Sequence, residues 1–270
     1  MDEFSCKYGT ICYLLTGART GGAALVFLHG LGSSHHQFDA VAKKLPIDRL
    51  VLMIDFPCHG DNAPKADTQQ NFSYFTSLVI ELCDHLGVEH AVFIGISMGG
   101  AVALRCAAMR PDLAISLMII RPAWLAAAAP DHLALIDRCA EWLTFMGMDD
   151  AIRALEHDAD YIEMRDDVAL SAASVRAVFD RDHAVAHAPV LSALFHSTPF
   201  ENVSAIRAIK TPTIVVGTHA DSFHPIAVAK ATTNALPNAE LHILPPRYLN
   251  PDEHQAALIE LITEKVGVAV

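Results

Sequence analysis

The run Gly95-Ile96-Ser97-Met98-Gly99 carries the strongest chemical signal in the chain. It follows the apolar stretch 91–94, which is typical of a buried strand, and precedes the helix-like stretch 100–109. A serine at a sharp strand-to-helix turn presents its hydroxyl at the end of a sheet, and the flanking glycines keep side chains out of the crowded turn. The pattern therefore predicts that Ser97 is a nucleophile. A tight turn that happens to contain a serine is the alternative.

A serine nucleophile needs a general base, a group that orients the base, and hydrogen-bond donors for the oxyanion. The turn His29-Gly30-Leu31-Gly32 follows the strand-like stretch 24–28, and a glycine-rich turn can direct backbone N–H groups into a site. We expect the amides of Leu31 and Met98 to be the oxyanion donors. An ordinary strand-to-helix turn is the alternative for 29–32.

Four segments together resemble the α/β-hydrolase superfamily over nearly the whole chain: His29-Gly30-Leu31-Gly32, Asp55-Phe56-Pro57-Cys58-His59-Gly60, Gly95-Ile96-Ser97-Met98-Gly99 and Gly217-Thr218-His219-Ala220-Asp221. The resemblance implies a twisted, mostly parallel sheet of about eight strands flanked by helices, with an inserted helical cap. It also implies a catalytic triad in the chain order serine, acid, histidine. It does not imply a substrate, because one fold hosts many chemistries.

Asp221 is the expected orienting acid. It comes shortly after the strand-like stretch 213–216, where the superfamily usually places this carboxylate. The alternative is an N-cap for the helix that begins near Pro225. The other position that the family sometimes uses follows the stretch 116–120, and it is occupied here by Arg121-Pro122.

The general base departs from the family pattern. Relatives usually have a Gly-His pair just after the last strand, but here 241–244 is followed by 245–250, which contains no histidine. His254 is the predicted base, because some capped relatives have a proline-rich turn and a short loop before their histidine. The alternatives are His242, another histidine such as His224, or no functional base. A surface histidine is the other interpretation of His254, because a helix N-terminus disfavours an imidazolium.

The substrate pocket is expected between the sheet edge and the helical insertion. Leu31, Met98 and Trp124 are the expected apolar lining, and packing at the cap junction is the alternative for Trp124. Arg121 lies where the strand meets the insertion, where a guanidinium could hold a carboxylate or a carbonyl group of the substrate. The alternative is an ion pair between Arg121 and an acidic side chain of the protein.

Strand-like and helix-like stretches alternate along the chain, which favours an α/β fold whose mostly parallel sheet is covered on both faces. The expected strands are 11–15, 24–28, 50–54, 91–94, 116–120, 213–216 and 241–244. The expected helices are 38–45, 72–86, 100–109, 226–235 and 251–266.

The alternation stops after Ile120. Apolar residues then recur at helical spacing up to Gly147, a predicted C-cap, and Asp149-Asp150 are predicted to cap the next helix. We therefore predict a hydrolase core at 1–122 and 206–270 and a helical cap insertion at 123–205. A helical layer packed elsewhere is the alternative.

Composition excludes several function classes. The 270 residues carry a formal net charge of -12, which argues against nucleic acid or an anionic membrane surface as a partner. The N-terminus does not resemble a signal peptide and the six cysteines form no C-x-x-C pair, so a cytoplasmic protein with reduced thiols is expected. The 15 histidines show no H-E-x-x-H or H-x-H spacing, so neither a metal nor a cofactor is expected.

The predicted activity is that of a cofactor-independent serine hydrolase acting on a small carboxylic ester or a similar acyl compound. Ser97, Asp221 and His254 would form the triad and pass through an acyl-enzyme. One alternative keeps the triad and cleaves a carbon–carbon bond in a diketone, a lactone or an amide. An alternative of another class is a small-molecule receptor with a vestigial triad. The expected partner is a small acyl substrate, and a homodimer is left open.

Overall fold

The computed structural model describes residues 1–7, 9–19, 22–45, 48–60, 62 and 70–268. Within these residues, eight strands form one sheet: β1 (Asp2–Cys6), β2 (Gly9–Thr16), β3 (Ala24–Leu28), β4 (Val51–Asp55), β5 (Ala91–Ile96), β6 (Ala114–Ile120), β7 (Thr213–Thr218) and β8 (Ala239–Leu244). Their order is β1-β2-β4-β3-β5-β6-β7-β8. Strand β2 pairs antiparallel with β1 and β4, and all other neighbours are parallel.

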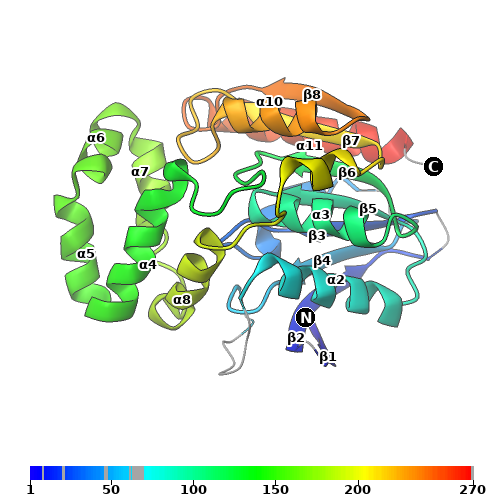
Figure 1. The fold of residues 1–270 in the computed structure, drawn as a ribbon, viewed down its shortest axis with the longest axis horizontal. Coiled ribbons are helices and arrows are strands. Elements are labelled where there is room, and N and C mark those ends of the chain that lie inside the picture. The colour runs from blue at the N-terminus through cyan, green and yellow to red at the C-terminus, as the bar shows by residue number, and fades with distance from the viewer. Residues whose placement is uncertain (8, 20–21, 46–47, 61, 63–69, 269–270) are drawn as a thin grey trace.

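Helices cover both faces of the sheet (Figure 1). The first face carries α2 (Phe72–His85), α3 (Met98–Met109) and α10 (Ile226–Ala235), and the second carries α1 (Asp39–Ala42), which follows the 3-10 turn η1 (His35–Phe38), and α11 (Pro251–Val268). Alternate residues of one strand enter the two cores: Phe93 of β5 packs on the first face, and Val92 and Ile94 pack on the second. This is why the central strands are apolar at every position.

The predicted α/β fold is confirmed, and so are the seven predicted strands, with small shifts at their ends. Strand β1 was not predicted. It is an edge strand whose residues are exposed or half-buried, so its sequence lacks the apolar signal of the interior strands. The predicted helix at 38–45 is shorter than expected: Phe38 belongs to the 3-10 turn η1, and α1 ends at Ala42.

The segment 123–205, which the structure describes throughout, contains no strand. It forms η2 (Asp131–Leu133), α4 (Ala134–Met146), α5 (Met148–His157), α6 (Ala159–Asp167), α7 (Ala169–Arg176) and α8 (Ala184–Phe195), and it ends in α9 (Val203–Arg207). Figure 1 shows α4–α8 grouped beside the sheet. The division of the chain into a core and a separate cap remains a prediction.

The predicted N-cap at Asp149-Asp150 is wrong. Gly147 is the predicted C-cap of α4, and it is also the N-cap of α5. No other residue separates the two helices. Both aspartates therefore lie in the first turn of α5, where their carboxylates interact favourably with the helix dipole.

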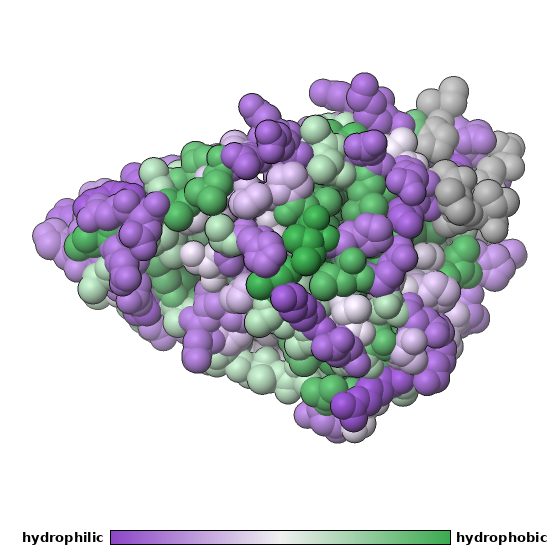
Figure 2. Space-filling model, turned by 90° about the horizontal axis from the view of Figure 1, so that it is seen from above, coloured by the Kyte–Doolittle hydropathy of each residue, from purple (hydrophilic) through white to green (hydrophobic). Residues whose placement is uncertain are grey.

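The surface seen from above is mostly hydrophilic, with hydrophobic residues in separate patches between (Figure 2). None of the helices among the described residues has the length and apolar character needed to cross a bilayer.

Candidate active site

Ser97 occupies a strained turn between β5 and α3. Its φ of 53° and ψ of -111° lie outside the regions that residues with a side chain normally adopt. Its backbone N–H donates to the Ile120 carbonyl oxygen at 2.9 Å, which ties the turn to the end of β6. The residue itself is 7% exposed. This is the geometry of a nucleophile elbow.

The glycines on either side of Ser97 are required by close backbone contacts. A Cβ atom on Gly95 would lie 2.3 Å from the Gly99 carbonyl oxygen, and one on Gly99 would lie 2.0 Å from the Leu28 carbonyl oxygen. Helix α3 therefore starts directly against the end of β3, and no larger residue fits there.

The turn after β3 is held by the His29 ring. Its Nδ1 donates to the Gly30 carbonyl oxygen at 2.8 Å, and its Nε2 accepts from the Phe56 amide at 3.1 Å. Burial lowers the pKa of His29 to about 4, so the ring is neutral and its role here is structural. Leu31 follows this turn and lines a cavity together with Ser97.

Met98 differs from one part of the prediction. Its side chain is fully buried among the residues of the first core and does not line the Ser97 cavity. Its amide lies at the N-terminus of α3, where backbone N–H groups lack helical partners. The role of the Leu31 and Met98 amides as oxyanion donors remains a prediction.

Asp221 lies in a turn after β7 with its carboxylate fully buried. Oδ1 accepts from the amides of Phe223 and His224, each at 3.1 Å, and the Arg121 guanidinium lies 3.4 Å from Oδ2. Burial opposes ionisation, but the His224 ring and then Arg121 hold the pKa of Asp221 well below its usual value. Asp221 is therefore ionised at neutral pH. The N-cap of α10 is Pro225, not Asp221.

His224 is the histidine that meets this carboxylate. Its Nδ1 lies 3.1 Å from each Asp221 oxygen and must donate, because an ionised carboxylate only accepts. Its Nε2 then carries a lone pair. Burial lowers the pKa of His224 although Asp221 raises it, so the ring is neutral at pH 7. His224 and Ser97 line the same cavity.

His254 has different partners. Its Nδ1 donates to the Pro245 carbonyl oxygen at 2.8 Å, and its buried Nε2 has no hydrogen-bond partner among the described residues. The His254 ring forms no hydrogen bond with Asp221 or Ser97, which the structure also describes, and His254 does not line the Ser97 cavity. His242 lies on β8 and pairs with Glu240 at 3.0 Å.

The sequence alone leaves His224 as one of several alternatives for the base. The signal that points to it is the spacing Asp-x-x-His directly after a strand. The Asp221 carboxylate accepts hydrogen bonds from the amides two and three residues later, and these bonds fold the chain back on itself. The fold brings the side chain of the residue three positions later, His224, next to the carboxylate.

The cavity beside Ser97 has a volume of about 250 Å³. The sheet edge and the insertion both contribute to its wall, and Trp124, Leu133, Ile136, Val178 and Leu191 supply much of its apolar lining. Arg121 and Arg247 also line it. Since pockets for drug-sized ligands are usually larger, about 300–1,000 Å³, the cavity fits a small molecule.

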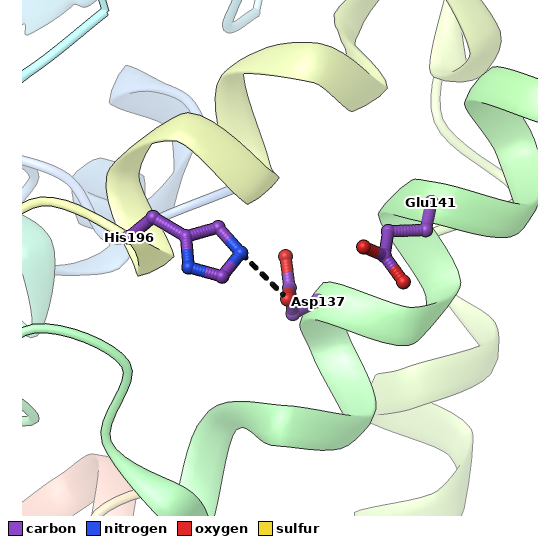
Figure 3. A group of neighbouring side chains, drawn as sticks. All are labelled: Asp137, Glu141 and His196. Carbon is purple, nitrogen blue, oxygen red and sulfur yellow. Dashed lines mark ion pairs between the residues drawn. The ribbon is translucent and has the colours of Figure 1, made fainter.

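One group of three potential metal ligands occurs among the described residues, and Figure 3 shows it between α4 and the end of α8. His196 Nε2 lies 3.2 Å from Asp137 Oδ2, an ion pair that accounts for their approach, and Glu141 is exposed. None of the three lines the Ser97 cavity. The expected lack of a metal or cofactor remains a prediction.

Comparison with known proteins gives one family. The family model described as "Alpha/beta hydrolase family" matches residues 25–260. A protein of Pseudomonas savastanoi pv. phaseolicola named "Putative carbamate hydrolase RutD" is 27% identical over 227 residues, which are 82% of this chain and 84% of that protein. An esterase of Mycobacterium tuberculosis is 29% identical over 161 residues, which are 56% of this chain and 53% of the esterase.

Solved structures agree on the fold. The enol-lactonase of Burkholderia xenovorans LB400 superposes with a TM-score of 0.76, over 98% of this chain and 100% of that chain, at 21% sequence identity. At this identity the likeness supports the fold alone.

The contact between α3 and β3 gives a stability prediction. Gly99→Ala should lower the free energy of unfolding by about 2 kcal/mol or more, because the new Cβ would collide with backbone that cannot move independently. Gly30→Ala is the matched control, since its Cβ would meet its nearest neighbours at 3.6 Å, an ordinary contact. Chemical denaturation of both variants measures the difference, and equal stabilities would show that the backbone contact at Gly99 tolerates a Cβ atom.

Proposed function

Because the chain belongs to the α/β-hydrolase family and is a hydrolase, we propose that it cleaves a small carboxylic ester or a similar acyl compound through Ser97. One observation carries the proposal. Ser97 in its strained turn shares a small cavity with His224, whose Nδ1 donates to the buried carboxylate of Asp221. That arrangement supplies a nucleophile, a base in the required tautomer, and an acid that orients the base.

In the proposed reaction, Ser97 Oγ attacks the substrate carbonyl carbon while His224 Nε2 takes the hydroxyl proton. The amides of Leu31 and Met98 donate to the oxyanion, and Asp221 stabilises the imidazolium. The tetrahedral intermediate collapses to an acyl-enzyme, and the leaving oxygen takes the proton from His224. A water molecule then gives a proton to His224 and attacks the acyl carbon. Collapse of this second intermediate releases the acid and returns the proton to Ser97.

The proposal assigns the base to His224 in place of the His254 predicted from sequence. A base that becomes charged during the reaction is stabilised by a carboxylate far more than by a carbonyl. His224 has the carboxylate of Asp221 as its partner, and His254 has the Pro245 carbonyl.

Carbamate hydrolysis is a second candidate, because the relative named for that activity matches most of this chain. The same acyl transfer steps apply to a carbamate, a lactone or an amide. A cytoplasmic location is also proposed. No disulfide joins the six cysteines, all of which lie among the described residues, and this fits a reducing compartment.

Ser97→Ala tests the nucleophile. Turnover of p-nitrophenyl acetate or butyrate should fall by about 1,000-fold or more, because the covalent route is lost. Labelling by a fluorophosphonate probe should disappear. Ser204→Ala in α9 is the matched control and should keep both properties, since this serine is exposed. Full activity of the Ser97 variant would refute the mechanism, and tight ligand binding without labelling of the wild type would favour a receptor.

His224→Ala and His254→Ala separate the two candidate bases. The first should lower the rate of Ser97 acylation by about 1,000-fold, and the second by less than about 10-fold. Rapid mixing with p-nitrophenyl acetate gives the acylation rate, and circular dichroism verifies folding. The reverse order of the two rates would identify His254 as the base.

The pKa of His224 gives a pH prediction. Below this pKa the ring is protonated and cannot accept the serine proton, so kcat/KM should fall on the acid side with a midpoint below pH 6.5. Asp221→Asn should move the midpoint to lower pH, because the carboxylate raises the pKa of His224. A wild-type midpoint above pH 7 would contradict this assignment.

A further inference from the structure

Two arginines bring positive charge to the wall of the Ser97 cavity. Arg121 follows β6 directly and is 4% exposed, and Arg247 lies in the segment between β8 and α11. Both line the cavity together with Ser97 and His224. A buried guanidinium is costly unless an anion or several acceptors satisfy it.

The protein offsets only part of this charge. Among the described residues, Asp221 is the only carboxylate that pairs with either arginine, through the 3.4 Å contact with Arg121. Arg247 donates to the hydroxyl of Tyr248 at 2.9 Å, and this phenol is neutral because burial raises its pKa. Asp221 is also shared with His224 and two backbone amides. Two cations therefore face one carboxylate.

Two donors on the cavity wall also lack an acceptor. Arg121 Nε and Trp124 Nε1 are both buried without a hydrogen-bond partner among the described residues, and both residues line the cavity. A buried donor without a partner costs about 1–3 kcal/mol, so natural proteins rarely keep one unless a ligand or water pairs with it. Guanidinium groups and an indole N–H are suited to a carboxylate.

We propose that the substrate cleaved at Ser97 carries a free carboxylate near its scissile bond, held by Arg121 and Arg247 with Trp124 as a further donor. This inference rests on the proposed hydrolase function and names its substrate class. The cavity volume of about 250 Å³ restricts the substrate to a short chain, such as the half-ester of a small dicarboxylic acid. The carboxylate belongs either to the acyl part or to the leaving part.

Two pairs of esters test whether the protein prefers an anionic ester and which part of the ester carries the carboxylate. Monomethyl glutarate carries the carboxylate in its acyl part, and dimethyl glutarate is its neutral counterpart. Acetoxyacetate carries the carboxylate in its leaving part, and propyl acetate is its neutral counterpart. At least one anionic ester should exceed its counterpart in kcat/KM by about 10- to 100-fold, as expected for charge-assisted hydrogen bonds.

Arg247 variants connect the preference to the residue. Arg247→Met should reduce the preference to about 3-fold or less, and Arg247→Lys should keep part of it, because the charge remains while the planar donor fork is lost. Arg207→Met in α9 is the control: it removes one exposed positive charge away from the cavity and should leave the preference unchanged. A preference that survives Arg247→Met, or falls equally with Arg207→Met, overturns the inference.

Binding to Ser97→Ala separates this inference from the proposed function. Calorimetry should give tighter binding of monomethyl glutarate or acetoxyacetate than of the matching neutral ester, and Arg247→Met should abolish the difference. Equal hydrolysis of anionic and neutral esters refutes the carboxylate site while the hydrolase stands. Selective anion binding without hydrolysis of any ester refutes the proposed ester hydrolysis while the carboxylate site stands. No selectivity in either assay refutes the inference.

Discussion

The close contact between the start of α3 and the end of β3 is the constraint on which the site depends. Gly99 lies against the carbonyl groups of Leu28 and His29, so the helix begins directly at the sheet edge and Ser97 must adopt a positive φ. Strain of this kind costs about 1–3 kcal/mol and persists only where the surroundings hold it. Here the fully buried strands β3 and β5 hold it. Strands β6 and β7 continue the sheet from β5 in the same direction, so the residues that follow them arrive at the same edge.

Electrostatics at this edge centre on one buried carboxylate. Asp221 is shared between the Arg121 guanidinium and the His224 ring, and it is ionised at neutral pH because the His224 ring, Arg121 and the nearby Arg247 outweigh the cost of burial. The carboxylate keeps the His224 proton on Nδ1, and burial keeps the ring neutral. The Asp221 carboxylate neutralises only part of the positive charge of Arg121 and Arg247. The same group therefore orients the proposed base and leaves the cavity able to accept an anion.

Sequence patterns predicted much of the fold and part of the site. Strands buried on both faces produce continuous apolar runs in the sequence, and the Ser97 turn requires glycine at positions 95 and 99. The sequence alone therefore identifies both features. Strand β1 was missed because an edge strand carries no such run. His254, the base predicted from the sequence, remains a prediction. Its place in α11 depends on the path of the chain after Pro245, which sequence periodicity does not encode. Arg247 was missed for the same reason, whereas Arg121 was found because it ends a recognisable strand.

The proposed reaction requires that His224 and Asp221 activate Ser97. A crystal structure of the protein after reaction with a fluorophosphonate would reveal this arrangement, because the phosphonyl group mimics the tetrahedral intermediate. We expect phosphorus bonded to Ser97 Oγ, a phosphonyl oxygen about 2.7–3.1 Å from the Leu31 and Met98 amides, and His224 Nε2 within hydrogen-bond distance of an oxygen on phosphorus. An adduct on another residue would rule out Ser97 as the nucleophile, and His254 in the position expected for His224 would rule out His224 as the base.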